Sequence, residues 1–216
     1  MITFNAFQKE AYAMRLCSVA TVIGFELSKE KATQLVLYLE LLAKWNKTYN
    51  LTAIRDPDEM LERHLVDSLS IVPFITAETL LDVGTGPGLP GIPLAIIYPE
   101  KQFTLLDSNS KKTRFITQSL ITLGLKNVDV RHNRIEALDK NEKYHQIISR
   151  AFTALPNFVE LCKQALTDNG QLLAMKGLKP DEKEAQLDSA YSITSMIELC
   201  VPGCDAQRHL IIIEPQ

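Results

Sequence analysis

Residues 81–91 consist of Leu81-Asp82-Val83-Gly84-Thr85-Gly86-Pro87-Gly88-Leu89-Pro90-Gly91. The apolar run at 79–83 has the length and composition of a buried strand, and residues 91–98 can form a helix. Glycines between such elements let the backbone turn tightly and approach a ligand closely, and the amides of a helix N-terminus can bind it. The stretch therefore predicts a strand–loop–helix unit of an α/β sheet with a ligand at the loop.

Strand-like and helix-like segments alternate after residue 76, which predicts βαβ units and a mostly parallel sheet. Further strands are expected at 102–106, 127–131, 145–149 and 171–176, and further helices at 110–123, 154–166 and 181–189. Segments 195–201 and 209–214, on either side of Pro202-Gly203, are expected to form a terminal strand pair.

The periodicity before residue 76 is typical of helices. Residues 8–23 form one candidate that Gly24 ends, Ser28 is a plausible N-cap for a second, and Asp56 starts a third that runs to about Ser70. We expect residues 1–75 to form an N-terminal helical cap on a Rossmann-like domain of residues 76–216. The two are expected to make one compact unit, an open sheet with helices on both faces.

The composition is that of an ordinary globular chain, with 216 residues, 46% hydrophobic residues and a formal net charge of −3. It argues against a disordered chain or a disulfide scaffold, and we interpret the four cysteines as reduced thiols. No apolar stretch reaches the roughly 18–20 residues that cross a bilayer, and the first ten residues lack the order of a signal peptide. We expect a cytoplasmic protein without a membrane partner.

Two nucleoside-containing ligands compete for the glycine loop. Gly86, Gly88 and Gly91 satisfy G-x-G-x-x-G, the dinucleotide fingerprint. Asp82, Gly84, Gly86 and Gly88 instead fit D-x-G-x-G-x-G, the loop that binds S-adenosylmethionine, and this register begins directly after the strand, where the turn must be. A dehydrogenase would also need a substrate domain, for which the residues after the fifth strand leave no room. The pattern favours a class I S-adenosylmethionine-dependent methyltransferase fold.

Residues that follow the next two predicted strands are expected to contact the ribose and the adenine of the cofactor. Asp107 ends the next predicted strand, where a carboxylate can accept both hydroxyls of a ribose. Ile135 and Glu136 follow the third strand, where an adenine ring could pack against Ile135. Glycines that merely turned a strand into a helix would leave the position of Asp107 unexplained.

Several specific motifs are spread over nearly the whole chain. They lie at residues 45–46, 49–52, 63–69, 82–93, 105–108, 134–136, 149–151 and 176–177, and the Gly-Thr-Gly-Pro-Gly-Leu-Pro-Gly-Ile-Pro run at 84–93 is the most specific. With these motifs the chain resembles the RsmG family, also called glucose-inhibited division protein B. These are bacterial methyltransferases that act on N7 of a guanosine in 16S ribosomal RNA.

The resemblance implies a set of cofactor contacts. By position they are Gly84, Leu89, Ile135, Glu136 and Arg150, to which the loop pattern and the ribose argument add Gly86, Gly88 and Asp107. The alternatives are a methyltransferase for a small molecule or a protein, a nicotinamide-binding module, and a non-catalytic ribosome-assembly factor.

Methylation of guanine N7 needs no general base, because N7 already presents a lone pair. We therefore predict positioning residues and no catalytic base. Arg150 ends a strand at the ligand-bearing edge, and His64 and Asp67 share one helical face that could line a guanine pocket. The simpler interpretation of this face is a pair that stabilises the helix.

An RNA partner is indicated by local charge, because residues 110–150 contain nine Lys or Arg against four acids. Lys111, Lys112, Arg114 and Lys176 are the expected RNA contacts. Many relatives continue into a basic tail where this chain ends, so we expect the 110–150 stretch to serve instead. The target guanine must be in a loop or be extruded, in free RNA, the small subunit or an assembly intermediate. Cys200, Cys204 and His209 lack a fourth zinc ligand, so no metal is expected.

Overall fold

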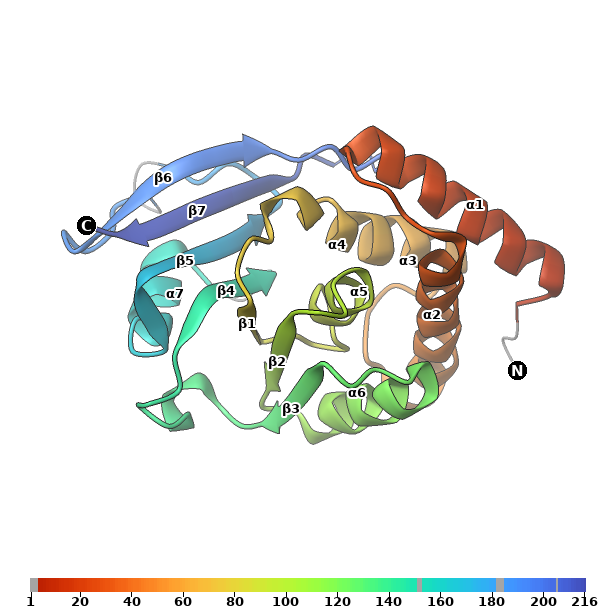
Figure 1. The fold of residues 1–216 in the computed structure, drawn as a ribbon, viewed down its shortest axis with the longest axis horizontal. Helices are drawn as coiled ribbons and strands as arrows, with labels where there is room; N and C mark the ends of the chain where they lie inside the picture. Colours follow the sequence, from red (N-terminus) through yellow and green to blue (C-terminus); the bar gives the residue numbers. More distant parts are fainter. Residues whose placement is uncertain (1–3, 151–152, 182–184, 205) are drawn as a thin grey trace.

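A seven-stranded sheet crosses the molecule in the computed structural model, which describes residues 4–150, 153–181, 185–204 and 206–216 (Figure 1). Its strands are β1 (Thr79–Val83), β2 (Gln102–Asp107), β3 (Val128–His132), β4 (Tyr144–Arg150), β5 (Leu166–Lys176), β6 (Tyr191–Glu198) and β7 (His209–Pro215). The strand order is β3-β2-β1-β4-β5-β7-β6. Strands β1 to β5 are parallel, and β7 is antiparallel to both β5 and β6. The predicted mostly parallel open sheet is confirmed.

Helices precede the sheet and connect its strands. They are α1 (Ala6–Ile23), α2 (Lys29–Tyr49), α3 (Pro57–Met60), a π-helical turn η1 (Leu61–Val66), α4 (Asp67–Leu69), η2 (Val72–Phe74), α5 (Gly91–Ile97), α6 (Ser110–Leu123), η3 (Ile135–Ala137) and α7 (Leu155–Cys162). Side chains of Asn5, Ser28 and Asp56 accept hydrogen bonds from first-turn amides of α1, α2 and α3, which stabilises these helix starts.

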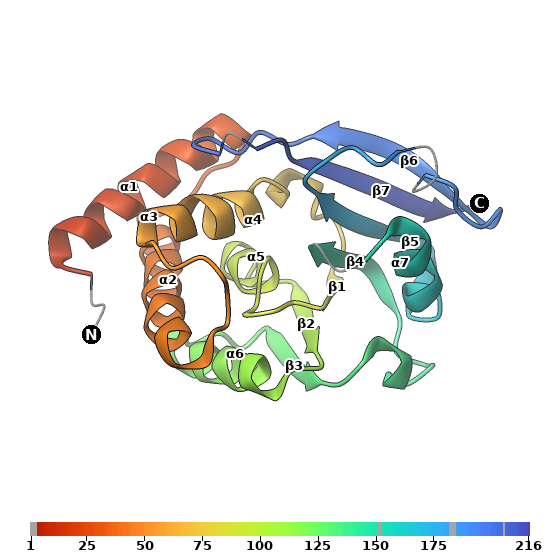
Figure 2. The same cartoon turned by 180° about the vertical axis from the view of Figure 1, so that it is seen from behind.

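Alternation along the strands gives the sheet two apolar faces. Leu105 lies in one core with α2, α5 and α6, whereas its neighbour Leu106 lies in a second core with Phe158 of α7. Figure 2 shows α7 beside β4 and β5, with α2 and α6 across the sheet from it. Helices thus cover both faces, as predicted, and the N-terminal helices all belong to the first core.

The N-terminal helices also reach the glycine loop. The hydroxyl of the buried Tyr38 on α2 donates a hydrogen bond of 2.9 Å to the carbonyl of Pro87. Leu35 and Leu39 of α2 share one core with Leu105 of β2. A division into a cap and a domain at residue 76 remains a prediction, but the packing couples the first helices to the loop.

Several predicted elements differ from the structure, and the strand expected at 171–176 begins earlier, at Leu166. The helix expected at 154–166 ends at Cys162, because β5 begins at Leu166 and its longer edge pairs with β4. The helix expected at 181–189 is wrong for residues 185–189, which form turns and extended chain, and residues 182–184 lie outside the described residues. The strand expected at 195–201 runs earlier, over β6, where its register with β7 lets Tyr191 pair with Pro215.

Within the described ranges, no helix is both long and apolar enough to cross a membrane. All four cysteines are free thiols. The residues that the structure describes contain no cluster of three His, Cys, Asp or Glu side chains arranged to hold a metal ion.

Candidate active site

The glycine loop follows β1 with a backbone that requires glycine. Gly84, Gly86 and Gly88 have φ angles of 65°, 64° and 98°, in the left-handed region that side chains rarely adopt. The amides of Gly84 and Thr85 both donate to the carbonyl of Leu106, at 2.9 and 3.1 Å. The loop is therefore fastened to β2, beside the place where Asp107 ends that strand.

Asp82 holds the loop from behind. Its Oδ2 accepts hydrogen bonds from the Thr85 hydroxyl at 2.6 Å and from the Gly91 amide at 2.8 Å. Its Oδ1 is buried without a hydrogen-bond partner among the described residues. Burial raises the pKa of Asp82 to about 6. This carboxylate thus joins the two ends of the loop, at a cost in desolvation.

Asp107 lies at the carboxyl end of β2 and is 7% exposed. One of its oxygens accepts from the Gly86 amide at 2.9 Å, and the other accepts from the Asn109 amide at 2.8 Å. The ammonium group of Lys112 is 3.7 Å from Oδ2. Each carboxylate oxygen can accept more than one hydrogen bond, so Asp107 is held in place and retains acceptor capacity.

A first cleft of about 360 Å³ opens at the carboxyl ends of β1, β2 and β4. It is lined by Val83, Gly84, Leu106, Asp107, Ser108, Lys112, Asn133, Arg134, Ile135, Glu136 and Arg150. Apolar side chains at the strand ends, a carboxylate and an arginine suit a nucleoside that carries an amino acid. These residues therefore fit S-adenosylmethionine.

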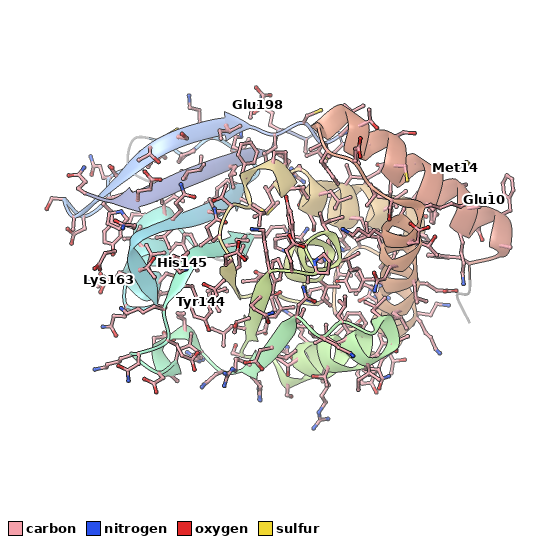
Figure 3. All side chains as sticks on the ribbon, in the orientation of Figure 1. Glu10, Met14, Tyr144, His145, Lys163 and Glu198 are labelled. Atoms are coloured by element: carbon pink, nitrogen blue, oxygen red, sulfur yellow. The ribbon has the colours of Figure 1, made fainter. Side chains whose placement is uncertain are left out.

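A second cleft of about 360 Å³ adjoins the first, because Arg150 lines both. Its walls are Ile54, Arg63, His64, Asp67, Arg150, Met175, Lys176, Gly177 and Arg208. Arg150 is the last residue of β4. Both clefts therefore lie at the opposite end of that strand from Tyr144 and His145, which Figure 3 labels where β4 begins. The two clefts meet at the edge where open α/β sheets bind ligands.

Asp67 joins two arginines at the second cleft. Its Oδ2 is 3.1 Å from Nη1 of Arg150, and its Oδ1 is 2.8 Å from Nε of Arg208. The side chain of Asp67 is 3% exposed, against 20% for Arg150 and 18% for Arg208. Because one buried carboxylate holds two cations, the cluster carries a net positive charge toward the cleft.

His64 is held as a neutral ring. Its Nδ1 lies 3.1 Å from the carbonyl of Arg63, which can only accept, so Nδ1 donates. Its Nε2 then accepts from the Thr52 hydroxyl at 3.0 Å. Burial, followed by the charge of Arg150, lowers the pKa of His64 to about 4. His64 is thus a poor base and fixes the π-helical turn on the 50–54 segment.

The depressed pKa of His64 predicts a pH-dependent stability. The unfolded chain binds this proton near pH 6.5 and the folded chain only near pH 4. Stability from His64 is therefore complete above pH 6.5 and declines by about 3 kcal/mol as the pH falls to 4. Asp82 gives the opposite pH dependence. Because its pKa is raised from 3.8 to about 6, its contribution to stability increases as the pH falls through this range.

A comparison with His64→Gln isolates this contribution. We expect urea unfolding curves of the variant between pH 4 and 7 to lose that decline, whatever the variant's stability at pH 7. Parallel pH profiles for the two proteins would show that His64 is not held neutral.

Comparison with known proteins identifies the family. The family model for rRNA small subunit methyltransferase G, also called GidB, matches residues 31–211. The chain belongs to this family. Relatives named ribosomal RNA small subunit methyltransferase G are 53% identical in Marinobacter nauticus, over 88% of this chain and 89% of theirs, and 49% identical in Hydrogenovibrio crunogenus, over 96% of both.

Solved structures share the fold of this GidB family member at much lower sequence identity. A SAM-dependent methyltransferase from Aquifex aeolicus has a TM-score of 0.55 at 17% identity, over 79% of this chain and 97% of that one. TrmN from Thermus thermophilus has a TM-score of 0.55 at 13% identity, over 72% and 53%. The class I methyltransferase fold is confirmed.

The structure gathers most of the predicted cofactor residues of this GidB chain. Gly84, Asp107, Ile135, Glu136 and Arg150 all line the first cleft. Three others are absent from its lining and build the loop behind it. These are Gly86, whose amide holds Asp107, and the buried Gly88 and Leu89.

The predicted positioning and RNA residues separate into groups. His64, Asp67 and Lys176 line the second cleft. Lys111 and Arg114 are exposed on α6 and line neither cleft. Lys112 lies inside the first cleft beside Asp107, so it is not on the same outer face as its neighbours in sequence.

Several lining residues of the two clefts were not among the predicted site residues, including Ser108, Asn133 and Arg208. Ser108 and Asn133 directly follow β2 and β3, and a rule that examines the residue after each strand would have found both. Arg208 directly precedes β7. The sequence holds no signal that Arg208 belongs to the site, because only the antiparallel pairing of β7 with β5 brings it to this edge.

Proposed function

We propose that the protein transfers a methyl group from S-adenosylmethionine to N7 of a guanosine in 16S ribosomal RNA, and thus works in the cytoplasm. The observation that carries the proposal is the pair of clefts that meet at Arg150. One has the donors and acceptors for the cofactor, and the other is a separate cationic pocket beside it. Membership of the rRNA small subunit methyltransferase G family supports the substrate.

S-adenosylmethionine supplies a methyl group on a sulfonium that a nucleophile can take by in-line displacement. Asp107 would accept the ribose hydroxyls, and Ile135 would pack against the adenine. The side chain of Arg150, at the boundary of the two clefts, would orient the charged end of the cofactor toward the acceptor. The role of the protein is to bring two reactants together in line and to exclude water, which accounts for several kcal/mol of barrier lowering.

The second cleft is suited to an acceptor that needs no deprotonation. His64 is neutral with its Nε2 engaged by Thr52, and Asp67 is occupied by two arginines. Neither side chain is available as a general base. Guanine N7 carries a free lone pair, so it is a nucleophile that this pocket could serve by orientation alone.

Partition of the label among acceptors tests the proposal. The protein is incubated with methyl-labelled S-adenosylmethionine and small ribosomal subunits that lack the modification, and in parallel with their naked RNA and their extracted proteins. We expect the label in RNA. Label in ribosomal protein or in small molecules would favour the other methyltransferase classes, and cofactor binding without transfer would indicate an assembly factor.

The outer basic surface is expected to contribute to RNA affinity. Lys111→Glu and Arg114→Glu change exposed α6 side chains that touch neither cleft, so each should weaken RNA binding several-fold and reduce the slope of log affinity against log salt by about 1. Cofactor affinity should be unchanged.

Lys126→Glu is the matched control for this surface. Lys126 is exposed in the same basic stretch, but it lies at the amino end of β3, beside the far end of α5. Equal losses in all three variants would indicate a general charge effect and would argue against a docking face on α6.

A further inference from the structure

The start of the antiparallel strand β7 reaches the active edge of the sheet. His209 pairs with Lys176, so the residue before β7 lies where β5 ends. The carbonyl of Arg208 accepts from the Leu199 amide at 2.8 Å, which fixes its backbone. The parallel strands place only their carboxyl ends at this edge. The antiparallel β7 begins there, and so it adds Arg208 from a distant part of the chain.

The guanidinium of Arg208 is held by two of its three nitrogens. Nε donates to Asp67 at 2.8 Å, and Nη1 donates to the carbonyl of Gln207 at 2.9 Å. Within the described part of the chain, Nη2 has no hydrogen-bond partner. Arg208 lines the second cleft, so a fixed arginine with an unengaged amino group borders it.

Arg150 is arranged differently. Its Nη1 donates to both Asp67, at 3.1 Å, and the carbonyl of Arg63, at 3.2 Å. It lines the first cleft as well as the second, whereas Arg208 lines only the second. Arg208 is therefore the arginine of the cluster that is placed to contact the acceptor alone.

Guanine presents O6 and N7 side by side, and an arginine with a free fork binds both at once. Such a contact would occupy the N7 lone pair that must attack the methyl group. A single donor satisfies O6 and leaves N7 free. It also disfavours adenine, which has an amino group in place of O6. In Arg208, Nε and one N–H of Nη1 are engaged by the protein, so among the described contacts Nη2 is the nitrogen that is left wholly free to donate to O6.

Resting on the proposed function, we propose that Arg208 donates from Nη2 to O6 of the acceptor guanine and is a specificity-determining residue of the reaction. Asp67 is its positioning residue, because the buried carboxylate holds Arg208 and Arg150 at a fixed separation. The second cleft is then the pocket of the acceptor base.

Kinetics with two RNAs test this inference. One carries guanosine at the modified position and the other carries 2-aminopurine, which keeps N7 and the 2-amino group but lacks O6. Arg208→Lys keeps a cation beside Asp67 but removes the amino group Nη2 that is proposed to donate to O6. We expect it to lower kcat/KM about 10- to 100-fold on the guanosine RNA and to leave kcat/KM on the 2-aminopurine RNA unchanged.

Asp67→Asn also loosens Arg150, so it should lower kcat/KM on both RNAs but more on the guanosine RNA, whereas a merely structural role of Arg208 would make Arg208→Lys equally harmful on both. The ratio between the two RNAs for one variant does not depend on how much of that variant folds. Binding of S-adenosylmethionine, measured in parallel by calorimetry, should be unchanged in Arg208→Lys.

Two results would overturn the inference. Full activity of Arg208→Lys on guanosine RNA would show that Nη2 makes no productive contact. Equal losses on both RNAs would show that Arg208 does not recognise O6. If the unaltered protein methylated no guanosine at all, the proposed function itself would fail.

Discussion

Asp107→Ala is expected to lower the affinity for S-adenosylmethionine about a hundred-fold or more. The carboxylate is buried at the first cleft, and two charge-assisted hydrogen bonds to ribose hydroxyls together stabilise a complex by roughly 3 kcal/mol or more. The same substitution removes the acceptor for the Gly86 amide, so the loop loses a support as well. Isothermal titration calorimetry of the intact protein measures the change.

Two controls separate ribose recognition from damage to the loop. Asp129→Ala removes an exposed carboxylate of the neighbouring strand β3 and should leave the affinity unchanged. The unaltered protein should bind S-adenosylhomocysteine more tightly than its 2′-deoxy form, and Asp107→Ala should lose this preference. A preference that survives in Asp107→Ala would assign the ribose to another group.

Gly88→Ala is expected to lower the free energy of unfolding by about 2–4 kcal/mol. A left-handed φ costs a side chain about 1–2 kcal/mol, and an added Cβ would lie 2.6 Å from Cδ1 of Ile92. Ile92 and the nearby Ile116 are fully buried, so neither can move aside cheaply. Urea unfolding followed by circular dichroism gives the difference.

Gly24→Ala is the matched variant for this substitution. Gly24 ends α1 with a φ of 102°, close to the 98° of Gly88, but an added Cβ would meet nothing within 4 Å. We expect it to cost only about 1 kcal/mol. Equal costs at both positions would mean that the loop relaxes and that close packing behind Gly88 is not what requires glycine.

The elements with strong local signals were predicted well. The strand at 79–83 and the helix at 110–123 have the bounds that the sequence predicts, because the glycine loop ends the first and Gly124 in a left-handed conformation ends the second. The ligand-bearing edge could also be predicted, since parallel strands place their carboxyl ends together.

Elements whose limits depend on tertiary pairing were predicted less well. The helix expected to reach 166 stops at Cys162 because β5 needs Leu166 for its pairing with Tyr144. Helical spacing placed His64 and Asp67 on one face, but it could not show that His64 lies in a π-helical turn or that Asp67 holds Arg208. Charge alone could not separate Lys112 from the outer surface of α6.

The most direct test of the central claim is the identity of the methylated nucleoside. Small-subunit RNA treated with the protein and S-adenosylmethionine is digested to nucleosides and analysed by mass spectrometry against standards. The two-cleft arrangement predicts 7-methylguanosine as the new product, formed by the unaltered protein and strongly reduced with Asp107→Ala. A methyl group on a carbon or a ribose oxygen, or no methylated nucleoside at all, would contradict it.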